Sequence, residues 1–211
     1  RVRAHHDQAG SPFGELEPHR DAGLLQLPVE LPSFTINPLS LRLINAAYRA
    51  NETRALGAHR LHYGPFFHPL DTVRGWSRIY GRAGMYQYQC VLPVPTAAAA
   101  THALLAHVSK SGEGSFLAVL KAFGALPSPG LLSFPMPGIT LAVDFANHGR
   151  KTLALFERLD QVVSEAGGRL YPAKDGRISR EMFAEGYPAL ARFARSVDPA
   201  CTSAFWERVR P

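Results

Sequence analysis

The chain has 211 residues, of which 46% are hydrophobic and 19% are charged, so a buried core is available and wholesale disorder is excluded. Lysine and arginine outnumber aspartate and glutamate by 23 to 17, and the net charge of +6 favours anionic partners such as phosphates, nucleic acid or an acidic membrane surface. The two cysteines form no CxxC pair, which argues against a zinc site or a disulfide framework, and no apolar run is long enough to predict a spanning helix.

The first part of the chain contains weak signals and one helix. Residues 1–23 are polar and are predicted to be a linker or an irregular segment, typical of the middle of a longer protein rather than of a signal peptide. Residues 24–36 are interrupted by prolines and are expected to be extended. A helix is predicted to begin at Pro38, because proline suits the first helical turn. Residues 59–68 resemble a strand and a loop, and a short helix is expected from Pro69 to Tyr80.

The middle of the chain alternates strand and helix patterns. Dense aromatic and β-branched residues with alternating polar positions predict a strand over 85–94. Thr96 is expected to cap the helix that follows. This order predicts an α+β fold, in which a ferredoxin-like split βαβ arrangement forms an antiparallel sheet with helices on one face. The further elements are a helix over 97–110, strands over 115–123 and 139–146, and a helix over 150–166 that Gly167 and Gly168 close.

The character of the sequence changes after Gly168. Residues 169–175 are expected to be extended, and three short helices are predicted over 179–185, 188–196 and 199–208. Asp198 is the expected cap of the last helix. This tail has too few apolar residues for a core of its own, so we expect it to pack on another part of the protein.

The strand over 85–94 carries two polar side chains that could bind a ligand. Its period of two places Gln87 and Gln89 on one face and the tyrosines and Cys90 on the other. Buried amides need partners, and these two suit the hydroxyls of a sugar or polyol. A half-solvated sheet face explains the same pattern.

Three further positions carry charge that could serve chemistry. Lys121 ends an apolar strand, where it is either a surface lysine or a cation for a phosphate or an oxyanion. Asp144 is either a general base or, more in keeping with a strand end, the partner of an arginine. Tyr171 and Lys174 flank a proline turn, and a lysine there can favour an anionic ring. Serine-hydrolase, zinc-protease and nucleotide phosphate-loop motifs are missing from the sequence.

Several short segments, taken in their order and spacing, resemble one family. The longest runs from Gly167 to Asp175, as Gly-Gly-Arg-Leu-Tyr-Pro-Ala-Lys-Asp. With them the chain resembles the FAD-linked oxidases of the vanillyl-alcohol-oxidase-like superfamily, above all those that act on lipid-phosphate-linked ribose, with the D-arabinono-1,4-lactone oxidases as wider kin. The other segments are Tyr80-Gly81, Gln87-Tyr88-Gln89, Ser115-Phe116-Leu117, Lys121-Ala122-Phe123-Gly124, Leu132-Ser133-Phe134-Pro135-Met136-Pro137-Gly138 and Val143-Asp144-Phe145.

The resemblance implies a division of the chain and a cofactor. In that family a substrate domain interrupts an FAD-binding domain, to which the chain then returns. Residues 24–168 then correspond to the substrate (cap) domain, and residues 169–211 to the C-terminal return segment of the FAD-binding domain. The N-terminal half that holds most of the FAD is not in this sequence, so the segment alone is expected to be inactive.

The resemblance also assigns roles to individual residues. Gln87, Gln89 and Lys121 match positions that line the substrate pocket. Tyr171, Ala173 and Lys174 match the segment that contacts the flavin ring. The resemblance makes Lys174 the catalytic residue, because its positive charge would stabilise the anionic reduced flavin during hydride transfer.

Two pocket positions depart from the family. Thr140 stands where the family has an asparagine, and Ala142 stands where it has a cysteine. Both are expected to line the substrate pocket. Inhibitors that capture the family's thiol should therefore fail on this protein.

The implied reaction is the oxidation of a secondary alcohol of a sugar, linked to a polyprenyl phosphate, to a ketone, as a step of cell-wall biosynthesis. A partner reductase would complete an epimerisation, no nucleic acid is expected, and the protein is expected in the cytoplasm or at the membrane surface. One alternative is oxidation of an aldonolactone or free polyol. Another is a non-catalytic ferredoxin-like module that binds nucleic acid, although its arginines are scattered and its strands lack the aromatic pattern of such modules.

Overall fold

The structure is a computed structural model that describes residues 25–32, 35–54, 73–114, 117–174 and 176–211. Contacts divide the chain into two units, Arg1–Pro28 with Gly57–Trp76 and Val29–Leu56 with Ser77–Pro211. In chain order the elements are β1 (Leu25–Gln26), α1 (Pro38–Arg54), β2 (Val73–Arg74), the 3₁₀ helix η4 (Trp76–Tyr80), β3 (Met85–Pro93), α3 (Val94–Ser111), β4 (Ala118–Phe123), β5 (Gly138–Ala146), α4 (Arg150–Glu165), β6 (Arg169–Leu170), the 3₁₀ helix η5 (Pro172–Lys174), α5 (Arg180–Gly186), α6 (Leu190–Ala194) and α7 (Ala204–Val209).

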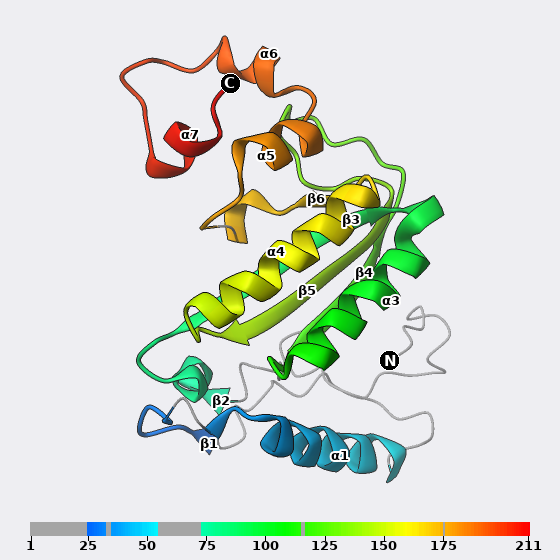
Figure 1. Cartoon of the computed structure of the whole chain (residues 1–211), viewed down its shortest axis with the longest axis vertical. Helices are drawn as coiled ribbons and strands as arrows, with labels where there is room; N and C mark the ends of the chain where they lie inside the picture. Colours follow the sequence, from blue (N-terminus) through cyan, green and yellow to red (C-terminus); the bar gives the residue numbers. More distant parts are fainter. Residues whose placement is uncertain (1–24, 33–34, 55–72, 115–116, 175) are drawn as a thin grey trace, which may run out of the picture. The chain divides into compact units, whose positions relative to one another are not determined.

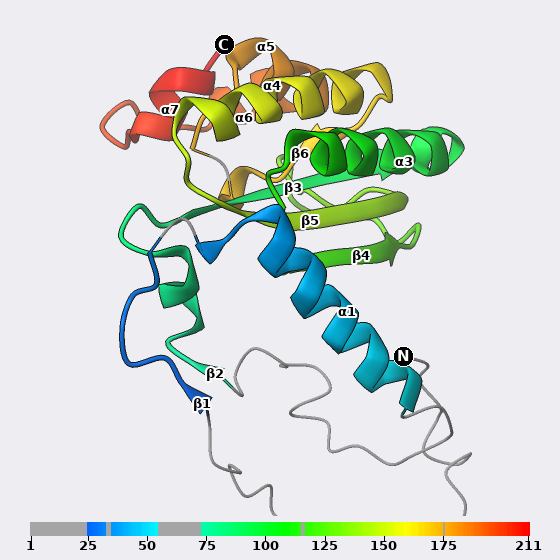
Figure 2. The ribbon, with the colours of Figure 1, turned by 60° about the horizontal axis from the view of Figure 1, so that its bottom comes forward.

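The second unit is built on a four-stranded sheet. Its strands lie in the order β4-β5-β3-β6, and every neighbouring pair is antiparallel. Together with α3 and α4 they follow the β-α-β-β-α-β order of a ferredoxin-like split βαβ fold. Figure 1 shows both helices running along the sheet, and Figure 2 shows them on one side of it. The expected α+β fold class is confirmed.

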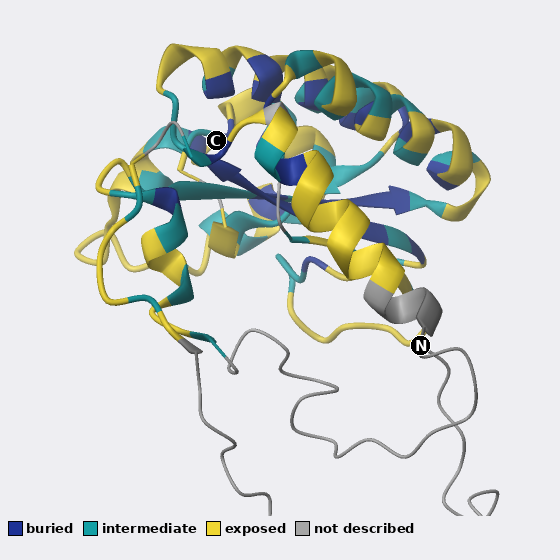
Figure 3. Ribbon diagram, turned by 90° about the horizontal axis from the view of Figure 1, so that it is seen from below, coloured by how far each residue is buried: buried dark blue, intermediate teal, exposed yellow. Residues whose placement is uncertain are grey.

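One face of the sheet is covered by α3 and α4, and we call it the covered face. Alternate residues of β3 point into it, and Tyr88, Cys90 and Leu92 are each at most 4% exposed. Phe156 of α4 packs there, with its ring centroid 5.2 Å from that of Tyr88 and 5.2 Å from that of Phe145 on β5. Figure 3 shows the resulting alternation of buried and exposed positions along the helices. Apolar residues therefore recur at every second position of the strands and about every 3.6 positions of α4, and both sets face the same core.

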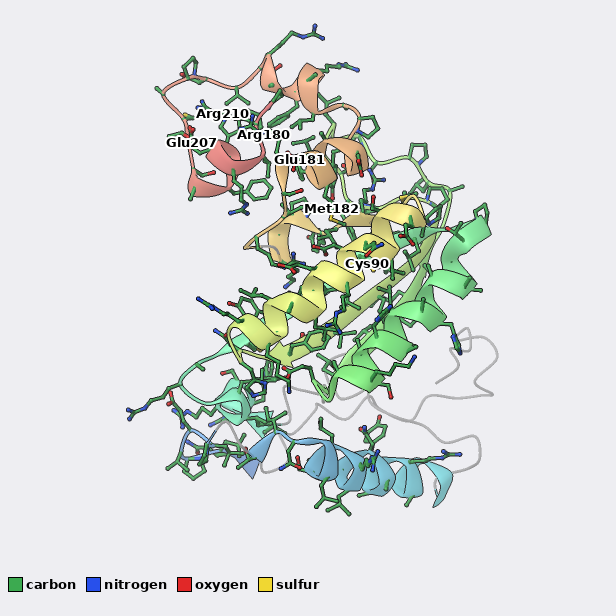
Figure 4. The ribbon with its side chains drawn as sticks, viewed as in Figure 1. Cys90, Arg180, Glu181, Met182, Glu207 and Arg210 are labelled. Carbon is green, nitrogen blue, oxygen red and sulfur yellow. The ribbon has the colours of Figure 1, made fainter. Side chains whose placement is uncertain are left out.

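The C-terminal tail packs on this core, as expected from its low apolar content. Ile178, Phe183, Tyr187 and Val209 are buried and belong to the same hydrophobic cluster as the sheet. The Ser179 side chain caps α5, whose first residues, Arg180 to Met182, are labelled in Figure 4. The tail begins as β6, which pairs with β3 and completes the sheet.

Two helix starts differ from the predictions. The helix expected from residue 97 begins at Val94, and Thr96 lies inside its first turn, where its hydroxyl donates to the carbonyl of Ala166 at 2.8 Å. The last helix begins at Ala204, capped by Ser203 rather than by Asp198. The Asp198 carboxylate instead accepts from the backbone N–H of Ala200 in a turn. In both places a capping residue type has found another backbone partner nearby.

The first unit holds a short parallel pair. Val73 and Arg74 form β2 beside β1, so the helix predicted from Pro69 to Tyr80 is wrong at these positions. Within the described part of this stretch, which begins at Val73, the helix covers Trp76–Tyr80, and Gly81 with φ 68° follows it. The predictions for 1–23 and 59–68 fall outside the described residues. Within the described part of the chain, no helix has both the length and the apolar character that crossing a membrane needs.

Candidate functional site

The second face of the sheet, which we call the polar face, carries the polar residues of β3 and their neighbours. Gln87 lies directly opposite Asp144 of β5, and Gln89 lies opposite Ala142. On the far side of β5, Lys121 of β4 lies opposite Thr140. Because side chains alternate along each strand, these six positions share one face.

A hollow of about 240 Å³ lies on this face. This volume is smaller than the roughly 300–1,000 Å³ of complete ligand pockets, and it suits one polar moiety of a ligand. The lining combines two amides, two ammonium groups, one hydroxyl and two small apolar side chains. Its residues are Gln87, Gln89, Val119, Lys121, Thr140, Ala142 and Lys174.

Asp144 holds the first amide. The side-chain N–H group of Gln87 donates to Oδ1 of Asp144 at 2.6 Å. Asp144 is only 1% exposed, and among the residues that the structure describes its other oxygen, Oδ2, has no hydrogen-bond partner. The arginine partner that a strand-end carboxylate suggests is therefore replaced by an amide.

The electrostatic surroundings of Asp144 are mixed. Burial raises the pKa of its carboxyl above the ordinary value, while the Gln87 hydrogen bond and the charge of Lys174 oppose that rise. Burial also raises the pKa of Tyr80, and the Asp144 charge adds to this effect. The Tyr80 phenol, the Gln87 amide and the Lys174 ammonium group thus all interact with the buried Asp144 carboxylate.

The second amide, that of Gln89, is also hydrogen-bonded to a residue of β5. Gln89 donates its side-chain N–H to the hydroxyl of Thr140 at 3.3 Å, a longer contact than that of Gln87. Thr140 is 2% exposed. Both glutamines of β3 therefore use an amide N–H to reach across to β5.

Lys174 reaches the hollow from η5, immediately after β6. The backbone N–H of Tyr171 donates to the carbonyl of Gln89, and the N–H of Lys174 donates to the carbonyl of Tyr171. These bonds tie the turn to β3. Tyr171 also borders a smaller adjoining hollow of about 20 Å³ that Lys174 and both glutamines share.

An aromatic stack supports this turn. The ring of Tyr171 stacks on Phe134 with centroids 4.5 Å apart, and Phe134 meets Phe123 of β4 edge-on at 6.0 Å. Phe134 comes from the loop between β4 and β5 and is 5% exposed. The proline-rich loop therefore packs against the segment that carries Lys174.

An ion pair anchors the other side of the turn. Arg177 binds both carboxylate oxygens of Asp160 on α4, with its Nη2 at 2.8 Å from Oδ1. Oδ1 also accepts from the hydroxyl of Tyr88 at 3.0 Å. The guanidinium lies over Phe156, 4.9 Å from the ring centroid. Bidentate pairing of this kind fixes geometry, so it holds the backbone after Lys174 against α4.

The structure brings most of the predicted site residues together. Gln87, Gln89, Lys121, Thr140, Ala142 and Lys174 all line the larger hollow, and Tyr171 borders the smaller one. Ala173 is exposed and borders neither hollow. Cys90 lies on the covered face, where burial raises the pKa of its thiol to about 12, so the described lining of the hollow contains no cysteine.

Sequence reasoning missed the specific role of Asp144 and the presence of Val119. The alternation of side chains along a strand could have identified both. Asp144 shares a face of β5 with Thr140 and Ala142, and Val119 shares a face of β4 with Lys121. The cross-strand pairing that opposes Asp144 to Gln87 depends on the register of the two strands, which a single sequence does not reveal.

The curated proteins that match this sequence include two of known source. The decaprenylphosphoryl-beta-D-ribose oxidase of Mycolicibacterium smegmatis is 39% identical over 180 residues, which are 83% of this chain and 38% of that protein. The chain is a relative of decaprenylphosphoryl-beta-D-ribose oxidase. The resemblance to oxidases of lipid-phosphate-linked ribose is thereby confirmed.

The second match is more remote. An uncharacterised protein from the mprA 5′ region of Streptomyces coelicolor is 33% identical over 134 residues, which are 62% of this chain and 36% of that protein. The chain therefore spans less than two fifths of the length of either relative. No family model matches the sequence.

Proposed function

We propose that the chain is part of an FAD-dependent oxidoreductase that oxidises a secondary alcohol of a lipid-phosphate-linked sugar to a ketone. The observation that supports this most is the hollow on the polar face, which gathers two amides and two ammonium groups. Amides suit the hydroxyls of a sugar, and ammonium groups suit phosphate oxygens or developing negative charge. The relative named above acts, by its name, on such a ribose derivative.

The residues of the turn around Lys174 fit the edge of a flavin ring. That edge carries carbonyl oxygens, which accept hydrogen bonds, and Lys174 supplies a cation in the hollow beside Gln87 and Gln89. Asp144 is buried nearby with an oxygen unpartnered among the described residues, and the charge of Lys174 acts to lower the pKa of its carboxyl. When bound, FAD supplies an acceptor at N5 for a hydride from the alcohol carbon.

The chain's own residues would orient the sugar and stabilise charge. Gln87 and Gln89 would bind ring hydroxyls, while Lys121, on the edge strand of the sheet, would bind a phosphate oxygen. Lys174 would hold positive charge beside the flavin, which would gain negative charge on accepting the hydride. Val119 and Ala142 leave a small apolar surface beside these groups.

The division of the chain is part of the same proposal. Residues 24–168 would serve as the substrate domain and residues 169–211 as the return segment of the FAD-binding domain. Cytoplasmic or membrane-surface location and a partner reductase follow from the same hypothesis. The net charge of +6 is compatible with attraction to a polyprenyl-phosphate substrate at an anionic membrane.

The test is the visible absorption spectrum of the complete gene product under anaerobic conditions. We expect a flavin band that bleaches on addition of a short-chain prenylphosphoryl-β-D-ribose. Bleaching by an aldonolactone but not by the ribose lipid would show that the substrate is an aldonolactone and not a lipid-linked sugar. A protein that cannot be reconstituted with FAD would refute the proposal, and salt-dependent binding of RNA would then favour the binding-module alternative.

A further inference from the structure

The two glutamines of the hollow are held differently by β5, although both donate an amide N–H toward it. Gln87 donates to a carboxylate at 2.6 Å, whereas Gln89 donates to a hydroxyl at 3.3 Å. An ionised carboxylate can only accept, whereas a hydroxyl can accept or donate. The partner of Gln87 therefore selects one orientation of the amide, and the partner of Gln89 does not.

This difference determines which group each amide offers to a ligand. With one of its two N–H bonds donated to Asp144, the Gln87 amide cannot turn over, and it keeps its carbonyl oxygen Oε1 as an acceptor beside the hollow that Gln87 lines. A fixed carbonyl recognises a hydrogen-bond donor, such as a sugar hydroxyl, and rejects an ether oxygen. Gln89 can turn over and recognise either.

We propose that Asp144 is a positioning residue that locks the Gln87 amide with its carbonyl oxygen toward the substrate, so that the site selects a free hydroxyl at that point. The inference rests on the proposed function and deepens it. Asp144 lies directly opposite Gln87 across the β3–β5 ladder and is 1% exposed, so the sheet fixes both partners. Asp144 acts through Gln87 and does not itself line the hollow.

The lock requires the ionised form of Asp144, and burial raises the pKa of this carboxyl above its ordinary value. Lys174 of η5 opposes the effect of burial on the pKa of Asp144, and Gln87 of β3 does the same through its hydrogen bond. Tyr80 of η4, among the described residues, also interacts electrostatically with the carboxylate. Protonation of Asp144 would release the lock, because a carboxylic acid can donate to the amide carbonyl.

A double-mutant cycle in the complete flavoprotein tests the lock. The variants are Asp144→Asn, Gln87→Ala and the double substitution, and the probe is a short-chain prenylphosphoryl-β-D-ribose. We expect each single substitution to raise KM about tenfold with a smaller change in kcat, because one hydrogen bond to substrate is lost. In the Gln87→Ala background, Asp144→Asn should change KM no further. Two effects that multiply would overturn the proposal, as would an unchanged KM for Asp144→Asn.

Specificity gives a readout that loss of packing would not alter. Mono-O-methyl ethers of the probe keep each ring oxygen and remove its hydrogen. For one ring position, we expect the wild-type protein to prefer the hydroxyl over the ether about tenfold in binding, and the Asp144→Asn variant to lose most of that preference. Thr140→Val is the matched control, since it removes the partner of Gln89 and should leave the preference in place.

A measurement without turnover separates this inference from the proposed function. In the ligand-free protein, the side-chain amide protons of Gln87 should give a downfield NMR signal that disappears in Asp144→Asn and titrates with Asp144. The same signal in both proteins would refute the lock. Absence of flavin reduction by the ribose probe, with the amide signal and its loss as expected, would instead refute the substrate class alone.

Discussion

The covered face and the polar face of the sheet are built from alternate residues of the same strands, yet they are held by different forces. On the covered face, Tyr88, Cys90 and Leu92 disappear beneath two helices. On the polar face, Gln87 and Gln89 are tied by hydrogen bonds around a hollow. The comparison teaches that a step of one residue along β3 moves a side chain from the apolar core to the lining of a polar hollow. Substitutions on the two faces should therefore affect different measurements.

The largest effect is expected on the covered face, from Phe156→Ala. Phe156 is 3% exposed and meets the rings of Tyr86, Tyr88 and Phe145. Removing its ring leaves a cavity under α4, and we expect a loss of about 3–5 kcal/mol in the free energy of unfolding. Hydrogen exchange of β3 and α4 peptides in increasing urea would measure it. Glu157→Ala, at an exposed position on the same helix, should change it by about 0.5 kcal/mol or less.

The next largest effect is expected on the polar face, from Lys174→Ala. The substitution removes a cation from the hollow, and we expect flavin reduction by the sugar probe to slow by about 10²- to 10³-fold, with a much smaller change in KM. Stopped-flow absorbance in the complete protein measures the rate. Lys110→Ala, which removes the same charge from the exposed end of α3, is the control. Reduction at the wild-type rate in Lys174→Ala would remove Lys174 from the proposed mechanism.

Glu113, in the loop after α3, carries a buried charge that belongs to neither face of the sheet, and we expect it to contribute to stability alone. Glu113, 3% exposed, accepts from Thr152 and pairs with His148 at 2.8 Å and Lys151 at 2.6 Å. Burial alone raises the pKa of Glu113, but Lys151 and His148 lower it below its ordinary value. The folded state thus favours the ionised form, and the stabilisation is complete at neutral pH.

Acid should therefore remove the contribution of Glu113. As pH falls through its lowered folded-state pKa, the ion pairs are lost and stability declines. We expect Glu113→Gln to cost about 1–3 kcal/mol at pH 7 and to unfold with a weaker acid dependence than the wild type. Urea unfolding at several values between pH 3 and pH 7 measures both. A variant with the full acid dependence of the wild type would show that other carboxylates are responsible.

The sequence allowed much of this arrangement to be predicted, for reasons that differ by residue. The period of two in β3 separates Gln87 and Gln89 from Cys90 without any knowledge of neighbours. The order of elements was enough to predict the ferredoxin-like sheet. The residues alone suggested Lys121 and Lys174 as cations, the resemblance added Thr140 and Ala142, and all four line the hollow.

Other features could not be predicted because they depend on contacts between distant segments. The partner of Asp144 follows from the strand register, and the anchor between Arg177 and Asp160 follows from how the tail lies on α4. The helix starts also differ from the prediction: the Thr96 hydroxyl donates to the carbonyl of Ala166, 70 residues along the chain, and Ser203 caps α7 in place of Asp198. Such choices between nearby backbone partners are decided by tertiary structure.

A smaller effect is expected from Gln89→Leu on the polar face. Leucine fills a similar volume but cannot bind a hydroxyl, so we expect KM to rise or kcat to fall by about 3- to 10-fold. Stability should change little, since Gln89 is only half-buried and its contact with Thr140 is long. Steady-state kinetics with the ribose probe measures the change, with Gln161→Leu on the exposed side of α4 as control. If neither constant moves, Gln89 is a structural residue of the strand.

The smallest effect on stability is expected from Ala142→Cys, which places a thiol on the polar face. Ala142 lines the hollow, so the new thiol should react with N-ethylmaleimide in the folded protein, while unfolding changes by about 0.5 kcal/mol or less. Cys90, one strand away on the covered face, is fully buried with its thiol pKa raised to about 12, and it should stay unlabelled. Peptide mapping by mass spectrometry distinguishes the two sites, with Cys201, which is exposed, as the positive control. Equal labelling at positions 90 and 142 would mean that the helices do not exclude solvent from the covered face. The two faces would then not differ in accessibility.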